Sequence, residues 1–250
     1  MTPDLELALS LADAADELTL GHFRSASLAV RTKADATPVS EVDEAVERLL
    51  RSRLPAADAI VGEEFGASSA SDAKRKWILD PIDATKNYIR GIPVFGTLIA
   101  LAVDDVLEVG VVSAPALQRR WWAARGQGAF CNGAPIRVSS IAKLEESQLG
   151  YDGIADFDKA GLSDKFLALA RSCYRTRAFG DFWIHMLVAE GAMDAAVEPE
   201  IAPWDVAAIQ LIVEEAGGRF TTLRGEATWA GGSAVSTNGL VHEAVLEALA

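Results

Sequence analysis

The segment Trp77-Ile78-Leu79-Asp80-Pro81-Ile82-Asp83-Ala84-Thr85-Lys86-Asn87 carries the densest chemical signal of the chain. Its apolar start is typical of a buried strand, and Pro81 fixes a turn that brings Asp80 and Asp83 close together. Two carboxylates held close raise each other's pKa, so a divalent cation between them stabilises the arrangement. Ligands that are all oxygen suit Mg²⁺. A second interpretation stays open at this point, in which Asp80 and Asp83 only cap the helix that follows.

Two other segments also place carboxylates at the ends of predicted elements. The apolar run at residues 59–62 ends in Glu63 and Glu64, and Asp205 opens a helix that ends at Gly217 and Gly218. The pair in the first segment therefore does not stand alone. This favours a metal-binding cluster over two helix caps.

The apolar pattern around these segments predicts both helices and strands. Helical spacing predicts helices at residues 5–23, 40–54, 162–171, 182–191 and 206–216. Short apolar runs predict strands at residues 59–62, 77–79, 96–103, 107–114, 121–124, 129–138, 195–198 and 219–223. The turn Cys131-Asn132-Gly133 is expected to close the hairpin that begins at Trp121, and residues 66–76 are expected to form a mobile connection.

A change of pattern near residues 139–150 predicts a boundary between two parts. Residues 1–140 would form an N-terminal α+β part that carries most of the metal ligands. Residues 141–250 would form a C-terminal α/β part that supplies Asp205 and the substrate contacts.

Charge and composition exclude several classes of protein. The net charge of −13 argues against a nucleic-acid-binding surface, which needs clustered lysine and arginine. An acidic protein that acts on a phosphate anion needs a cation as a bridge, which again indicates metal. No stretch is apolar enough for a membrane helix and acidic residues interrupt the N-terminal segment, so the sequence predicts a cytoplasmic protein with no membrane partner. Cys131 and Cys173 lack the spacing of a zinc site and are expected to be reduced thiols.

Together these motifs resemble the inositol monophosphatase superfamily. Its two signatures match Asp80-Pro81-Ile82-Asp83-Ala84-Thr85 and Trp204-Asp205 through Gly217-Gly218, with Gly62-Glu63-Glu64 as a third landmark. The resemblance covers nearly the whole chain. It implies an α+β/α/β fold of the layered αβαβα sandwich type, phosphomonoesterase activity, two or three Mg²⁺ ions per active site, and a homodimer.

The resemblance also implies roles for individual residues. The implied metal ligands are Glu63, Asp80, the carbonyl of Ile82, Asp83 and Asp205. The implied catalytic residues are Thr85 and Asp43, which would orient the attacking water, together with Glu63. The implied phosphate and substrate contacts are Ala84, Thr85, Asp83, Asp181, Glu198 and Asp205. Hydrolysis would be direct and in line, without a phosphoenzyme.

Three further stretches resemble the histidinol-phosphate phosphatases of this superfamily. They are residues 113–126, 62–66 and 177–182. We therefore expect L-histidinol phosphate as the substrate, with its ammonium and imidazole received by Asp181 and Glu198. Inositol 1-phosphate or another small phosphate monoester is the alternative. The competing function is a catalytically silent relative that binds a phosphate ligand or a partner protein.

Several residues keep two interpretations. Ala84 stands where the family usually has glycine. An alanine there costs little if φ is negative, but it strains the backbone if φ is positive. Lys33 matches a family lysine near the metal, but a solvated surface lysine is the favoured interpretation. Glu64 would either join a third Mg²⁺ site or lie exposed. The remaining residues are expected in structural, surface or packing roles: His22, His185, His242, Trp121 and Trp122, the two tryptophans on opposite faces of a strand.

Overall fold

The computed structural model describes residues 1–33, 37–68 and 73–250. The helices are α1 (Pro3–His22), α2 (Glu41–Arg53), α3 (Thr85–Ile89), α4 (Ile154–Lys159), α5 (Ser163–Ser172), α6 (Asp181–Ala189), α7 (Pro203–Glu215) and α8 (His242–Leu249). The strands are β1 (Val30–Thr32), β2 (Pro38–Ser40), β3 (Ala59–Gly62), β4 (Gly66–Ala67), β5 (Arg75–Asp83), β6 (Gly96–Val103), β7 (Val106–Ala114), β8 (Arg119–Ala124), β9 (Ala129–Cys131), β10 (Ala134–Ile136), β11 (Gln148–Tyr151), β12 (Arg175–Arg177), β13 (Ala195–Glu198), β14 (Arg219–Thr221) and β15 (Ala234–Thr237). Two short 3-10 helices lie at Pro115–Leu117 and Leu144–Glu146.

Within the described residues the strands form two main sheets. The large sheet has eight strands in the order β10-β9-β8-β7-β6-β5-β3-β4, and the small sheet has five in the order β12-β11-β13-β15-β14. β1 and β2 form a separate antiparallel ribbon. In the large sheet β3 and β5 run parallel, so their carboxyl ends meet at one edge.

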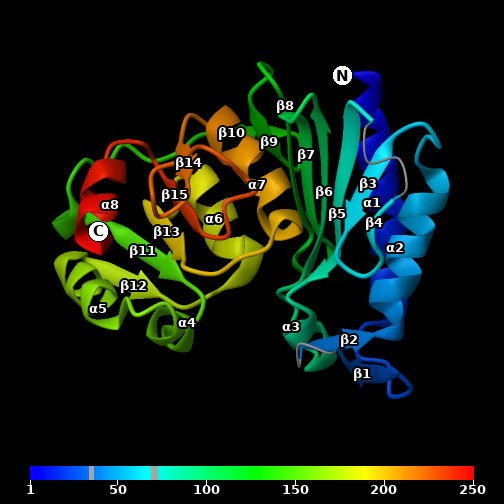
Figure 1. Ribbon diagram of the computed structural model, residues 1–250, viewed down its shortest axis with the longest axis horizontal. Helices are drawn as coiled ribbons and strands as arrows, with labels where there is room; N and C mark the ends of the chain where they lie inside the picture. Colours follow the sequence, from blue (N-terminus) through cyan, green and yellow to red (C-terminus); the bar gives the residue numbers. More distant parts are fainter. Residues whose placement is uncertain (34–36, 69–72) are drawn as a thin grey trace.

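Five layers follow one another along the molecule (Figure 1). α1 and α2 cover one face of the large sheet, α6 and α7 lie between the two sheets, and α4, α5 and α8 cover the outer face of the small sheet. The layered αβαβα fold expected from the sequence is thus confirmed. Alternation along β5 explains how one strand serves two layers, because Trp77 and Leu79 pack under α1 and α2 while Ile78 faces α7.

The middle layer is largely apolar because both of its faces are covered. Residues 206–213 of α7 are all buried. At Gly110 of β7 the helix comes so close that a Cβ atom would lie 2.7 Å from the carbonyl oxygen of Ala208. Gly110 therefore sets the distance between α7 and the large sheet.

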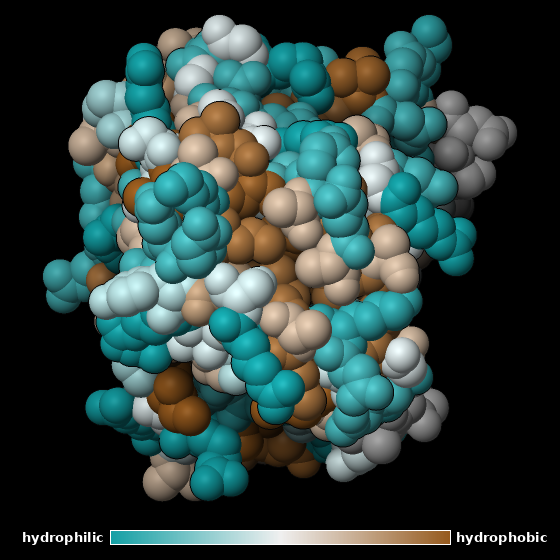
Figure 2. Space-filling model, turned by 90° about the vertical axis from the view of Figure 1, so that its left-hand side faces the viewer, coloured by the Kyte–Doolittle hydropathy of each residue, from teal (hydrophilic) through white to brown (hydrophobic). Residues whose placement is uncertain are grey.

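The outer helices of the small sheet behave as surface helices do. Phe166 and Leu169 of α5 and Val245 of α8 pack against the sheet. Viewed from this side, the surface mixes hydrophilic residues with hydrophobic ones that show between them (Figure 2). Among the described residues, no helix is both long and apolar enough to cross a membrane.

Several sequence predictions need correction. The turn at Asn132 and Gly133 joins β9 to β10, whereas the hairpin of β8 and β9 turns at residues 125–128, so residues 129–138 are two strands and not one. The predicted connection at residues 66–76 contains β4 and the start of β5; residues 69–72 lie outside the described residues. β5 is longer than predicted because its pairing with β6 continues to Asp83.

The large sheet lies within residues 59–136 and the small sheet within residues 148–237. The predicted boundary near residue 140 falls between them. Because α7 packs on the large sheet and also contacts β14 and β15, the division into two parts stays a prediction. Cys131 and Cys173 are free thiols.

Candidate active site

The parallel pair β3 and β5 brings the first two carboxylates together. Gly62 pairs with Leu79, and the Glu63 amide donates to the Leu79 carbonyl at 3.2 Å, so Glu63 and Asp80 leave the sheet side by side. The register between β5 and β6 then shifts between Asp80 and Asp83. Such an irregularity redirects side chains at a strand end.

A third carboxylate reaches the same place from α7. Asp205 lies in the first turn of that helix, where one of its oxygens accepts a hydrogen bond from the Ala202 amide at 3.0 Å. Carboxylate oxygens of Asp80, Asp83 and Asp205 all lie within 4.8 Å of one another. Three of the predicted carboxylates, from two distant segments, therefore lie together, and they could hold a metal ion.

Burial and mutual repulsion act on the carboxylates of this cluster. Burial, followed by the charges of Glu63, Asp83 and Asp205, raises the pKa of Asp80 well above its usual value. Burial raises the pKa of Asp205 to about 7. One oxygen of Asp80, Oδ1, is buried without a hydrogen-bond partner. An orphaned oxygen among ionisable carboxylates fits a hard divalent cation.

A cavity of about 210 Å³ opens onto these residues. Its lining includes Glu63, Ile82, Ala84 and Lys86 together with the three clustered aspartates. The Ile82 carbonyl, an implied metal ligand, lies 2.9 Å from the Thr85 hydroxyl oxygen.

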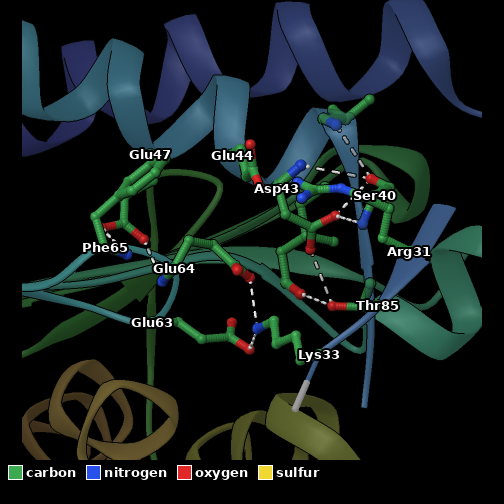
Figure 3. Close-up of polar contacts among 12 residues, drawn as sticks. Arg31, Lys33, Ser40, Asp43, Glu44, Glu47, Glu63, Glu64, Phe65 and Thr85 are labelled. Carbon is green, nitrogen blue, oxygen red and sulfur yellow. Dashed lines mark hydrogen bonds and ion pairs between the residues drawn. The ribbon is translucent and has the colours of Figure 1, made fainter. Parts of the chain in front are cut away.

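Thr85 also connects the cavity to α2. Its hydroxyl lies 3.0 Å from Oδ1 of Asp43, as Figure 3 shows. Asp43 is buried, and its other oxygen accepts hydrogen bonds from the amide and hydroxyl of Ser40, which caps α2. Burial raises the pKa of Asp43. The predicted pair of Asp43 and Thr85 is therefore in contact.

Lys33 is not the solvated surface lysine favoured by the sequence. Its ammonium group donates to Glu63 and to Glu64, each at 2.7 Å (Figure 3). Burial opposes the charge of Lys33, but the bonds to the two glutamates outweigh it and raise its pKa. The Glu64 side chain is only 5 % exposed, so the exposed alternative for this residue is wrong.

A second cavity, of about 110 Å³, shares Asp83, Asp181 and Asp205 with the first. Its remaining acidic lining consists of Asp152, Asp156, Glu198 and Glu200. Burial and the charge of Asp152 raise the pKa of Asp181 to about 8, and burial raises the pKa of Glu198. The predicted substrate contacts Asp181 and Glu198 thus lie together beside the aspartate cluster.

Comparison with known proteins agrees with this geometry. The model of the inositol monophosphatase family matches residues 1–250. The chain belongs to the inositol monophosphatase family. It is accordingly a phosphoric monoester hydrolase.

Three relatives illustrate the similarity. The histidinol-phosphatase of Mycobacterium tuberculosis is 51 % identical over 98 % of this chain and 97 % of its own. That of Streptomyces coelicolor is 47 % identical over 97 % and 95 %. The solved structure of a Thermotoga maritima IMPase superposes with a TM-score of 0.89 at 31 % identity, covering 99 % of this chain and 97 % of that one.

In this inositol monophosphatase family member, Ala84 is the N-cap residue of α3. Ala84 has φ 65° and ψ 44°, which is the left-handed conformation. This is the strained case foreseen for an alanine at this position.

The histidines and tryptophans take the expected structural places, with one addition. Trp121 and Trp122 point to opposite faces of the large sheet. His185 is buried on α6, and its ring nitrogens contact the Ser236 hydroxyl at 2.7 Å and Glu198 at 3.3 Å. Burial lowers the pKa of His185 to about 3, so a neutral imidazole supports the Glu198 carboxylate. His185 and Asp152 are site residues that the sequence analysis missed.

Proposed function

We propose that this enzyme hydrolyses L-histidinol phosphate to L-histidinol and phosphate. The observation that carries the proposal is the second cavity, whose lining among the described residues contains seven carboxylates and neither lysine nor arginine. Such a chamber suits a cationic substrate, because carboxylates form charge-assisted hydrogen bonds with ammonium and imidazolium groups. The names of the two bacterial relatives support the same substrate.

The residues that would hold Mg²⁺ are Glu63, Asp80, the Ile82 carbonyl, Asp83 and Asp205. Two or three bound Mg²⁺ ions would polarise the phosphate and lower the pKa of the attacking water. Asp43 accepts the hydrogen bond of the Thr85 hydroxyl, which leaves the Thr85 oxygen free to accept a hydrogen bond from that water and so to orient it toward phosphorus. The backbone amides of Ala84 and Thr85 would hold the phosphate oxygens. Glu63 would act in catalysis, together with Thr85 and Asp43, as a ligand of Mg²⁺.

Asp181 and Glu198 would bind the organic part of the substrate. The Asn87 amide lies 3.3 Å from an oxygen of Asp181, and His185 contacts Glu198, so each carboxylate has a neutral partner that orients it. Asp152, the next acidic residue in the chamber, adds negative charge. Inositol 1-phosphate is the second candidate, since its hydroxyls could donate to the same carboxylates and one relative is named an inositol-1-monophosphatase.

Side-by-side kinetics test the substrate. We expect kcat/KM for histidinol phosphate to exceed that for inositol 1-phosphate by at least about tenfold, the effect of one or two charge-assisted hydrogen bonds. Asp181→Asn and Glu198→Gln should reduce this ratio, whereas Asp164→Asn on the outer helix α5 should leave it unchanged. Equal rates on both substrates would refute the assignment. If neither substrate gives a turnover that EDTA abolishes, the protein is instead the catalytically silent relative.

Three further statements belong to the proposal. We infer a homodimer from the family resemblance. We infer a cytoplasmic location from the acidic residues that interrupt the apolar pattern of the N-terminal segment, and an enzyme that does not bind nucleic acid from its acidic charge. Sedimentation of the purified protein tests the first. A binding assay with DNA and RNA at low salt tests the last.

A further inference from the structure

A buried carboxylate on α2 contacts the loop that carries Glu63. The Glu47 side chain is fully buried. Its Oε2 accepts a hydrogen bond from the Glu64 amide at 2.7 Å, and its Oε1 accepts one from the Phe65 amide at 3.2 Å and one from Arg51 at 2.7 Å. Figure 3 shows this carboxylate above the loop, opposite the Glu63 and Glu64 side chains. Both oxygens are thus occupied by donors from the loop and from its own helix.

The end of β3 is shaped around this carboxylate. Gly62 precedes Glu63, and a Cβ atom there would lie 2.1 Å from Oε1 of Glu47. No side chain fits between the two, because real Cβ atoms do not approach other atoms so closely. The loop is secured on its far side as well, since Arg51 donates to the Gly66 carbonyl and the Phe65 ring lies under the Arg48 guanidinium at 4.9 Å.

The same helix holds the other half of the site. Asp43 precedes Glu47 by one turn, so both point to the same face of α2. Asp43 contacts Thr85, which opens α3 just after β5, while Glu47 contacts the loop after β3. One helix therefore fixes the two neighbouring strand ends relative to each other.

We propose that Glu47 is a positioning residue for metal binding. By holding the Glu64 and Phe65 amides, it fixes the backbone from which the Glu63 carboxylate reaches toward Asp80. This inference rests on the proposed role of Glu63 as a Mg²⁺ ligand. A carboxylate that only stabilised the fold would not change how tightly the folded protein binds Mg²⁺.

The test is Mg²⁺ affinity, measured by isothermal titration calorimetry in the presence of inorganic phosphate. Glu47→Gln keeps the size of the side chain but replaces one acceptor by an NH₂ group, which faces an amide donor. We expect the Mg²⁺ dissociation constant to rise about 10- to 100-fold, the usual effect of losing a residue that orients a metal ligand. Glu44→Gln is the matched control, because Glu44 lies on the same helix and pairs only with Arg31 and Arg48 among the described contacts. It should bind Mg²⁺ as the unmodified protein does.

Two further variants make every outcome informative. Glu47→Asp keeps the charge and withdraws the carboxylate from the loop by one methylene, so it should also weaken Mg²⁺ binding. It replaces Glu47→Gln in the test if Glu47→Gln does not fold. Glu63→Gln tests the premise. If Glu63→Gln binds Mg²⁺ normally, the ligand assignment fails and with it the role of Glu47. The other decisive outcome is that Glu63→Gln weakens Mg²⁺ binding, while the Mg²⁺ dissociation constants of folded Glu47→Gln and Glu47→Asp stay within about twofold of that of the unmodified protein. Such a change is far below the expected range, and Glu47 would then not be a positioning residue.

Discussion

A single side chain, that of Ala84, shows how closely the backbone is constrained next to the reacting groups. With φ 65°, it holds a conformation that costs an alanine about 1 kcal/mol or more. The cost is tolerated because the residues on either side, Asp83 and Thr85, are held by hydrogen bonds to Phe182 and to Asp43.

Ala84→Gly should therefore raise the free energy of unfolding by about 1 kcal/mol, because glycine adopts the left-handed conformation without strain. We expect the phosphatase activity to persist in both proteins, since every carboxylate remains. Urea denaturation measures the stability. Ala45→Gly, in the middle of α2, is the control of opposite sign and should cost about 1 kcal/mol. A loss of stability in Ala84→Gly would contradict the strain, and activity in the glycine variant alone would mean that the natural chain is inactive.

Asp80→Asn should abolish turnover, because it removes a charged ligand and leaves the size of the side chain unchanged. Without metal the same variant should melt at a higher temperature, since the repulsion that raises the pKa of Asp80 is removed. Steady-state kinetics and thermal melting in EDTA measure the two effects. Turnover at about half the normal rate would rule out the ligand assignment, because losing a charged Mg²⁺ ligand costs far more.

Site residues could be predicted from the sequence where a chemically suitable side chain also stands next to a recognisable local pattern. Asp80 and Asp83 were recognisable because they follow an apolar run and lie on either side of Pro81. Asp152 was not, because it follows β11, whose sequence Gln-Leu-Gly-Tyr gives little strand signal. Glu47 and His185 sit on helices, where nothing local distinguishes a buried polar side chain whose partner comes from another element.

At the scale of elements, the contact between β7 and α7 positions a metal ligand. α7 carries Asp205 in its first turn, and Gly110 lets the helix approach the large sheet. The spacing between helix and sheet is thus part of the geometry of the active site.

Gly110→Ala should force α7 away from the sheet, because the new methyl group would meet backbone atoms that cannot rotate aside. We expect a loss of about 1 to 3 kcal/mol in unfolding free energy, typical of overpacking, together with weaker Mg²⁺ binding through Asp205. Chemical denaturation and calorimetry measure the two. Gly21→Ala in α1 is the control, since no atom lies within 4 Å of its new methyl group and it should not destabilise. If folded Gly110→Ala binds Mg²⁺ with unchanged affinity, the position of α7 does not determine the geometry of the metal site.

Three strands that the sequence analysis missed share a physical cause. β11, β12 and β15 are four residues or fewer, and they contain Gly, Thr, Ser or Arg in place of a continuous apolar run. β15 becomes a buried strand because β13 and β14 pair with it on both sides, which is a property of the assembled sheet. α8 has an apolar stripe, but it lies at the chain terminus, where no following turn marks it.

For the molecule as a whole, the buried carboxylates make stability depend on pH. Their pKa values are raised on folding, to about 7 for Asp205 and about 8 for Asp181, from 3.8. The folded protein therefore holds protons that the unfolded chain releases, and this contribution to stability is present at low pH and lost as pH rises from about 4 to about 8.

The metal-free protein should accordingly melt at a lower temperature at pH 8 than at pH 5.5. Mg²⁺ with phosphate should raise the melting temperature again at pH 8, because the folded protein binds the ion and the unfolded chain cannot gather the ligands. At a hundredfold excess of Mg²⁺ over Kd, binding adds about 2.7 kcal/mol to the free energy of unfolding, or about 5 to 10 °C to the melting temperature. The rise should be smaller at pH 5.5, where protons compete. Differential scanning calorimetry measures all four conditions. A melting temperature independent of Mg²⁺ at pH 8 would contradict the cluster.

The position of α7 between two sheets has a consequence for synthesis of the protein. A chain leaves the ribosome from its N-terminus, so the large sheet can form before α7 appears, whereas β14 and β15 are made after it. One side of this apolar helix finds its sheet and α6 already made, but the part of its surface that β14 and β15 will cover stays open to solvent. Nascent chains that end before residue 234 should therefore bind chaperones or aggregate, and release should wait until β15 has joined the small sheet.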